Sequence, residues 1–179
     1  LFPITRSDLV MGDFEKLPQR NVDFGGGLER IAAASAGNGD VFTLDVFAPI
    51  IRALEVASGK FYADATFQRS FRIVVEHLRA SVFLIADGAH PSNTGQGYFT
   101  RRLLRRAVRH LDLLGVKENT LGKLVASVIT TYQETYPSLF TKRSQIEEEI
   151  ADEEQKFRKT LTTGLKEFQR ASTGKKEVS

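Results

Sequence analysis

The chain has 179 residues, of which 41% are hydrophobic, so it can form a core and is not expected to be disordered over most of its length. It contains no cysteine, which excludes disulfide bonds and thiolate metal sites and is typical of a cytoplasmic protein. No apolar run approaches the roughly 18 residues of a membrane-spanning helix, so we expect no membrane partner. The net charge is only +3, but residues 101–110 carry five arginines and no acid, so local charge is more informative than the total.

Short β-strands are predicted for residues 1–4 and 21–24, separated by a loop punctuated with Gly and Pro. Two isolated strands are only marginally stable in water, so we expect them to be the edge of a larger sheet. From residue 28 onward the pattern is helical almost throughout, and the sequence therefore predicts a mainly α protein preceded by a short β and loop segment.

The predicted helices follow in chain order. Residues 28–36 form the first, and Asp45 is expected to cap a second helix that ends at Gly59. Further helices are expected over 70–86, from about 97 to 114, from a cap at Asn119 to near 136, and over 141–170. The last would be about 45 Å long at ~1.5 Å per residue, and residues 172–179 are predicted to be a disordered tail.

The glycine run Gly25-Gly26-Gly27 precedes the first helix and has two interpretations. It can be a purely structural turn, or it can let the backbone approach a phosphate at the helix N-terminus, with Arg30 pairing one turn further on. It is not a P-loop, because no Gly-Lys-Ser/Thr follows. It is not a dinucleotide-binding fingerprint either, because no parallel βαβ unit surrounds it.

The arginines at 101, 105 and 109 share one helix face, and those at 102 and 106 flank it. Like charges at this spacing repel by a few tenths of a kcal/mol per pair, so anions are expected nearby. One source is the acidic segment 147–154 folding back on this helix, and the other is nucleic-acid phosphate. The two sources are compatible if they serve different arginines.

Asn93 lies in the polar turn before this helix and can be a turn residue, a helix cap or a reader of a base edge. The three histidines, His77, His90 and His110, are far apart in sequence and show no metal-ligand spacing, so no metal site is expected. His77 is predicted to be a hydrogen-bonded group of the core. No complete catalytic constellation is present.

Several segments resemble the alanyl-tRNA synthetase family. Residues 23–30 (DFGGGLER) resemble that family's version of class II motif 3, and residues 41–51 (VFTLDVFAPII) resemble the segment after it. Residues 72–93 (RIVVEHLRASVFLIADGAHPSN) and 97–110 (GYFTRRLLRRAVRH) match its tRNA-recognition region, and residues 153–165 resemble a further acidic motif. The resemblance covers about residues 20–170, and the block from 72 to 110 is highly specific.

The resemblance implies roles for individual residues. Gly25, Gly27 and Arg30 would bind ATP, with Arg30 on the γ-phosphate, and Asp23 would accept a hydrogen bond from the amino group of alanine. Asn93 would help to read the third G·U wobble pair of the tRNA acceptor stem, in the wide minor groove of A-form RNA. The arginines would set register on tRNA phosphates, and the sequence leaves open which of them do so: Arg101, Arg102, Arg105, Arg106 and Arg109.

The sequence also departs from the family pattern. Phe24 stands where a Thr is usual and Gly26 where a Met is frequent, and motifs 1 and 2, the second wobble reader and the editing domain are not found. We therefore expect a central segment of a synthetase: residues 1–37 as the remnant of an antiparallel class II catalytic domain, 38–171 as a helical tRNA-recognition domain with a long C-terminal helix, and 172–179 as a tail.

The resulting expectation is a recognition module for the tRNA(Ala) acceptor stem. The parent reaction is the ATP-dependent attachment of alanine to tRNA, with Mg²⁺ in the full-length enzyme, and this chain alone is predicted to be inactive and to need no cofactor. DNA is not an expected partner. Two alternatives remain: one subunit of a split synthetase whose partner carries motifs 1 and 2, or a helical protein-interaction module whose arginines pair only with its own acidic helix.

Overall fold

The computed structural model describes residues 25–116 and 120–172, and this part of the chain contains seven α-helices and no strand. The mainly helical fold predicted from the sequence is therefore confirmed. The strands predicted for residues 1–4 and 21–24, the cap predicted at Asn119 and the tail after residue 172 lie outside the described residues and stay predictions.

The chain divides into two compact units, Leu1–Val41 and Phe42–Ser179. In the described part of the first unit, helix α1 (Leu28–Ser35) begins after Gly27 and is followed by its C-cap residue Ala36 and by Gly37, which has φ of 65°. Only Ala33 of α1 is buried. The functional division predicted at residues 37 and 171 stays a prediction.

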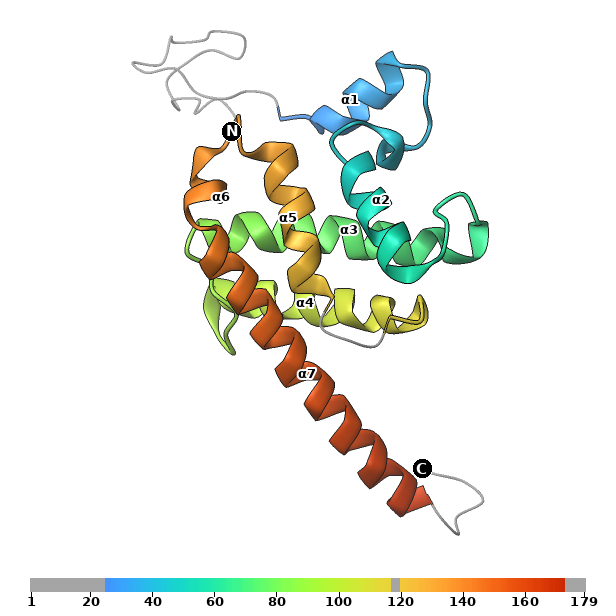
Figure 1. Ribbon diagram of the computed structural model, residues 1–179, viewed down its shortest axis with the longest axis vertical. Helices are drawn as coiled ribbons and strands as arrows, with labels where there is room; N and C mark the ends of the chain where they lie inside the picture. Colours follow the sequence, from blue (N-terminus) through green and yellow to red (C-terminus); the bar gives the residue numbers. More distant parts are fainter. Residues whose placement is uncertain (1–24, 117–119, 173–179) are drawn as a thin grey trace, which may run out of the picture. The chain divides into compact units, whose positions relative to one another are not determined.

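The second unit is a bundle of helices around one hydrophobic core (Figure 1). A 3₁₀ turn at Val41–Thr43 leads into it. Helices α3 and α4 lie side by side and form the most extensive contact between elements, while α7 packs on α5 and α4. The helices of the unit are α2 (Ala48–Ser58), α3 (Ala65–Ala86), α4 (Gly95–Leu113), α5 (Leu121–Tyr132), α6 (Pro137–Thr141) and α7 (Arg143–Ser172).

Two helices, α3 and α2, begin at other residues than the sequence predicted. Helix α3 begins five residues before the predicted start at Ser70, because the Asp64 carboxylate accepts a hydrogen bond from the Thr66 N–H at 2.9 Å. The prediction of Asp45 as a cap is wrong: α2 begins after Phe47, with Pro49 in its first turn. Gly59 ends α2 with φ of 64°, as predicted.

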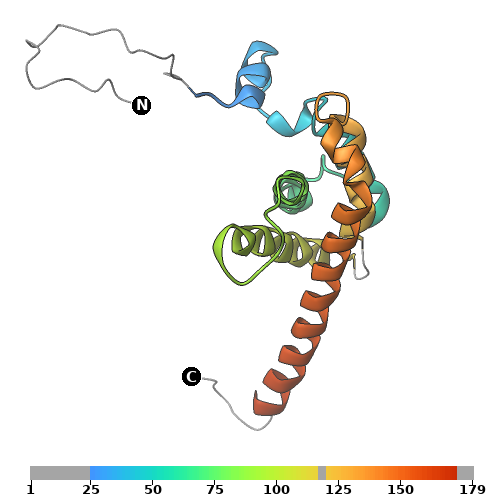
Figure 2. The ribbon, with the colours of Figure 1, turned by 90° about the vertical axis from the view of Figure 1, so that its left-hand side faces the viewer.

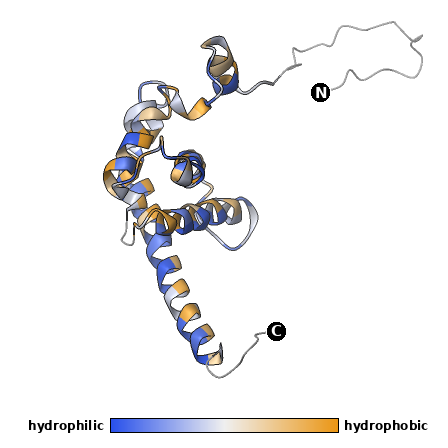
Figure 3. Ribbon diagram, turned by 90° about the vertical axis from the view of Figure 1, so that its right-hand side faces the viewer, coloured by the Kyte–Doolittle hydropathy of each residue, from blue (hydrophilic) through white to orange (hydrophobic). Residues whose placement is uncertain are grey.

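Helix α7 is 30 residues long, and only its first half packs on the bundle. Ile146 and Ile150 are fully buried, whereas Leu165 and Phe168 further along are 60% and 56% exposed. Figure 2 shows the second half of α7 continuing past α4, and Figure 3 shows it as mostly hydrophilic with scattered apolar residues. Residues of the first half of α7 are therefore the ones that can hold α4 and α5 in position.

Two consecutive glutamates in α7, Glu153 and Glu154, are buried. The carboxylate of Glu154 accepts hydrogen bonds from the backbone N–H of Leu121 at 2.8 Å and of Thr120 at 3.3 Å, at the start of α5. Arg158 donates to the same carboxylate at 2.9 Å. A carboxylate on α7 thus caps another helix, where negative charge also interacts favourably with the helix dipole.

Gly122 allows this close approach of α5 to α7. A Cβ at that position would lie 3.1 Å from the Ala151 Cβ and 3.3 Å from the Glu147 carbonyl oxygen. The absence of a side chain therefore brings the first turn of α5 close enough for Glu154 to reach its N–H groups.

We expect Glu154→Ala to lower the free energy of unfolding by about 2–4 kcal/mol, because it leaves buried N–H groups unpaired and removes a partner of Arg158. Urea denaturation followed by circular dichroism measures the change. Asp152→Ala is the matched control, because the Asp152 side chain is 58% exposed and its effect should stay within about 0.5 kcal/mol. Equal midpoints for Glu154→Ala and Asp152→Ala would contradict the capping role.

Candidate nucleic-acid interface

Residues 89–97, here called the 89–97 turn, comprise most of the connection between α3 and α4 (residues 89–94) and the first three residues of α4. Hydrogen bonds and close packing hold this segment against the first turns of α4. The buried Thr100 hydroxyl donates to the Ala89 carbonyl at 2.8 Å, and the Ser92 N–H donates to the Gly97 carbonyl at 3.1 Å. A Cβ at Gly97 would lie only 2.0 Å from the His90 carbonyl oxygen. Glycine is therefore required at this position, and the turn is a defined structure.

Asn93 lies exposed in this turn. Its Oδ1 accepts a hydrogen bond from Nη1 of Arg101, which lies in the second turn of α4. The N-cap of α4 is Thr94 rather than Asn93, so the capping role left open for Asn93 is not the one observed. Its amide nitrogen makes no hydrogen bond to any described residue. The Asn93 side chain is therefore held by Arg101 through its oxygen, while its amide nitrogen is open to solvent.

Two of the five arginines of α4 pair with the acidic helix. Arg105 Nε donates to Glu153 Oε1 at 2.7 Å, and Arg101 Nε lies 3.3 Å from Glu153 Oε2. The Arg105 guanidinium also lies over the Phe157 ring, 5.2 Å from its centroid. Of the two anion sources considered for this helix, the acidic segment is thus the observed one for Arg101 and Arg105.

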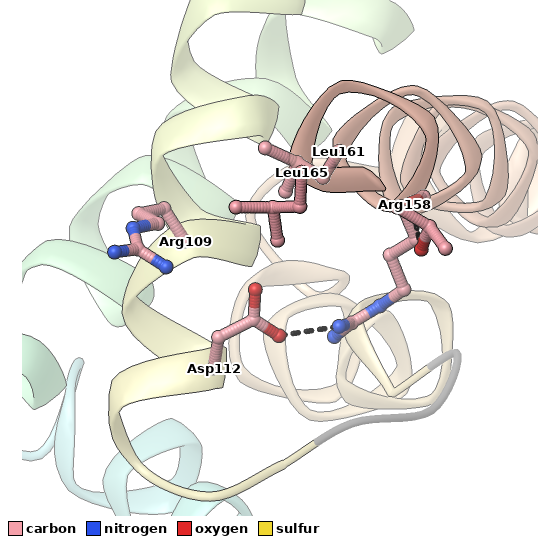
Figure 4. A pocket seen from close by; sticks show the side chains of 6 residues that line it. Arg109, Asp112, Arg158, Leu161 and Leu165 are labelled. Carbon is pink, nitrogen blue, oxygen red and sulfur yellow. Dashed lines mark hydrogen bonds and ion pairs between the residues drawn. The ribbon is translucent and has the colours of Figure 1, made fainter. Parts of the chain in front are cut away.

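The other three arginines, Arg102, Arg106 and Arg109, are exposed and form no ion pair with any described residue. Arg109 borders a cavity of about 560 Å³ between α4 and the second half of α7. The acid in that cavity, Asp112, pairs with Arg158 at 2.5 Å, and Figure 4 shows Arg109 outside this pair. These arginines are available for an external anion.

Two histidines lie beside these arginines. His110 Nδ1 is 3.1 Å from the Ser70 hydroxyl of α3, and its pKa is lowered by burial and by the charges of Arg106, Arg69 and Arg109. Burial, with smaller contributions from Arg106 and His110, lowers the pKa of His77 to about 4. Both histidines are therefore expected to be neutral at pH 7.

The prediction that His77 is a hydrogen-bonded core group is wrong in part. The ring is partly buried, but its Nε2 has no hydrogen-bond partner in the described structure. An unsatisfied buried nitrogen raises the cost of adding a proton charge there, which agrees with the direction of the pKa shift.

The glycine turn belongs to the other unit. Gly25 and Gly27 are exposed, and Gly27 carries no side chain that could cap the first N–H groups of α1. Arg30 is exposed, and its stem lies against Gly27, where an added Cβ would be 3.4 Å from the Arg30 Cδ. Asp23 lies outside the described residues, so its predicted contact with alanine stays a prediction.

His90 and Arg69 also belong to the helical site, in roles that the sequence did not predict. His90 Nδ1 lies 2.9 Å from Glu149 Oε2, which ties the 89–97 turn to α7 a second time, and Arg69 adds positive charge from α3. Contacts between distant segments carry no local signal, which is why sequence patterns did not reveal them. No cluster of three potential metal ligands occurs in residues 25–116 and 120–172, and no helix in these ranges is long and apolar enough to cross a membrane.

Residues 5–179 match the family model described as tRNA synthetases class II (A). Alanine–tRNA ligase of Streptococcus pyogenes serotype M18 (strain MGAS8232) is 44% identical over 152 residues, which are 85% of this chain and 17% of that protein. Alanine–tRNA ligase of Streptococcus suis (strain 98HAH33) is 42% identical over 171 residues, or 93% of this chain and 20% of that protein. The chain thus spans about a fifth of the length of these relatives.

We expect His77→Gln to reduce the loss of stability on acidification. The folded-state pKa of about 4 is below the usual 6.5, so the unfolded chain binds the extra proton between these values and stability falls as pH falls through this window. Urea denaturation at several pH values between about 7 and 4 measures the difference from the unsubstituted chain. Parallel pH profiles would contradict a lowered pKa at His77.

Proposed function

The chain belongs to the alanyl-tRNA synthetase family of class II, and from this premise we propose that its helical unit binds the acceptor stem of tRNA(Ala). The observation that carries the proposal is the division of the arginines on α4. Two of them are paired inside the protein, while Arg102, Arg106 and Arg109 form an exposed cationic surface on α4, the helix that follows the turn containing Asn93.

The exposed arginines are proposed to contact backbone phosphates. A guanidinium presents several N–H donors to a phosphate, and such contacts fix register without reading sequence. Arg69 on α3 belongs to the same positive region, because its charge acts on His110 together with those of Arg106 and Arg109. Arg101 and Arg105 are proposed to contribute less to phosphate binding, because both already form ion pairs with Glu153.

Asn93 is proposed to read the third G·U pair of the stem. A wobble pair leaves the guanine amino group without a partner in the minor groove, where A-form RNA is wide and shallow. The Oδ1 of Asn93 has two lone pairs, of which Arg101 uses one, so the second can accept from that amino group. The exposure of Asn93 and the rigid 89–97 turn support this role.

The proposed parent reaction is the ATP-dependent attachment of alanine to tRNA. Gly25, Gly27 and Arg30 are proposed to contribute to the ATP site, where the open N-terminus of α1 and the nearby guanidinium favour a phosphate. Mg²⁺ is proposed as the companion of ATP in the complete active site. Asp23 is proposed to hold the amino group of alanine.

Substitution of the exposed arginines tests the phosphate contacts. For binding to an acceptor-stem minihelix, Arg102→Ala, Arg106→Ala and Arg109→Ala are each expected to reduce the slope of log K against log salt concentration by about one. Fluorescence anisotropy over a salt series measures the slope. The control Arg170→Ala removes an exposed arginine near the end of α7 that pairs with Glu167, and should leave the slope unchanged.

The same measurement separates the proposed function from its alternative. A slope that none of the three substitutions changes would contradict phosphate binding by this surface. Absence of binding even at low salt would favour a protein-interaction module whose arginines serve only the acidic helix.

Asn93→Ala tests the reading of the wobble pair. We expect the preference for a minihelix with G·U over one with G·C to fall on the order of fivefold, the worth of about one hydrogen bond. Affinity for the G·C hairpin should hardly change. The control is Thr94→Ala, because the Thr94 side chain is exposed and makes no capping bond. Equal preference in Asn93→Ala and Thr94→Ala would contradict the role of Asn93.

A further inference from the structure

Asn93 is connected to the interior of the protein through Arg101. One end of the Arg101 guanidinium donates to Asn93 Oδ1, and the Nε at its other end lies 3.3 Å from Oε2 of Glu153. The Nε–H is not aimed well enough to count as a hydrogen bond, so the contact with Glu153 is an ion pair. Arg101 thus connects the exposed amide of Asn93 to the carboxylate of Glu153, whose side chain is only 4% exposed.

Glu153 is itself held in a fixed orientation. Its second oxygen accepts from Arg105 Nε at 2.7 Å, and Arg105 is backed by the ring of Phe157, one turn further along α7. The next residue, Glu154, fastens the same turn of α7 to the start of α5. The carboxylate of Glu153 therefore has little freedom to move with Arg101. We infer that Glu153 restricts the position of Arg101, and that Arg101 in turn restricts Asn93.

Packing alone does not fix Arg101. A cavity of about 200 Å³ lies beside it, lined by residues of the 89–97 turn and of α7, among them His90, Glu149 and Lys156. A long side chain next to open space has several rotamers available, and holding one of them costs conformational entropy. The charge of Glu153 and the bond to Asn93 supply the interactions that select this rotamer.

We propose that Glu153 is a positioning residue for recognition of the wobble pair: through Arg101 it orients the Asn93 amide so that the free lone pair of Oδ1 faces the RNA. This role rests on the proposed function of Asn93. Pre-organisation of this kind lowers the entropy cost of binding and sharpens discrimination, since a freely rotating amide can also present its NH₂ group to the wrong pair.

The orientation can be measured without RNA. In ¹⁵N NMR spectra of the free protein, the Asn93 side-chain amide is expected to show restricted motion, and Glu153→Gln is expected to shift its signal and increase its mobility. Arg101→Met breaks the same connection from the other side while leaving Glu153 paired with Arg105, so it serves if Glu153→Gln folds poorly. Both variants should loosen the Asn93 amide.

Glu154→Gln is the matched control, because it alters an adjacent buried carboxylate that contacts α5 and not Arg101. It should lower stability but leave the Asn93 amide signal unchanged. A purely structural role for Glu153 would make the two glutamine variants alike in this spectrum, and that result would overturn the proposal.

Binding to the minihelices then links orientation to recognition. Glu153→Gln and Arg101→Met are expected to lower the G·U over G·C preference on the order of fivefold, with the salt slope set by the exposed arginines unchanged in Glu153→Gln. If Asn93→Ala lowers the preference but these variants do not, the positioning role is overturned and the proposed function stands. If the unsubstituted chain shows no preference, both the reading by Asn93 and its positioning by Glu153 are overturned.

Discussion

The arrangement of the helical unit depends on two consecutive buried carboxylates. Neighbouring residues on an α-helix point about 100° apart, because the helix has 3.6 residues per turn. Glu153 therefore meets arginines of α4 while Glu154 meets the N-terminus of α5. This geometry sets α7 against both helices at once. Because a buried carboxylate is costly unless it is paired, any slip of α7 along its neighbours would leave at least one charge uncompensated.

The electrostatics of α4 follow from this constraint. On the side of α4 that faces α7, the single carboxylate of Glu153 pairs with both Arg101 and Arg105. Arg102, Arg106 and Arg109 have no such partner in the described structure, so their positive charges repel one another. This repulsion destabilises the helix slightly and therefore does not serve folding. The result is a helix whose Arg101 and Arg105 are paired with α7, while the charges of Arg102, Arg106 and Arg109 stay unpaired in the described structure. The proposed polyanionic ligand would pair with these three arginines without competing with Glu153.

The fold was largely predictable, because helical periodicity and the glycines at 59 and 115 are local signals. The start of α3 was missed because its first turn lacks a strong apolar pattern, and Asp45 was mistaken for a cap because a suitable residue type does not guarantee suitable geometry. The short helix α6 was missed for lack of length. The sequence identified the arginines and Asn93 as candidate site residues. It did not predict which arginines pair with Glu153 and which stay unpaired, because that depends on how α7 packs against α4.

Two histidines, His77 and His110, lie in the positive field of the exposed arginines of α4. Arg106 lowers the pKa of both His77 and His110, and Arg69 and Arg109 add to the effect at His110, although burial is the larger cause in each case. Three guanidinium groups from two helices thus act on one imidazole, so the positive region extends beyond α4 onto α3. An anion bound there would oppose this shift and favour a protonated His110. Charge on the histidine and charge on the ligand are therefore coupled, and binding of a phosphate at this surface should tighten as the pH falls toward the lowered pKa of His110.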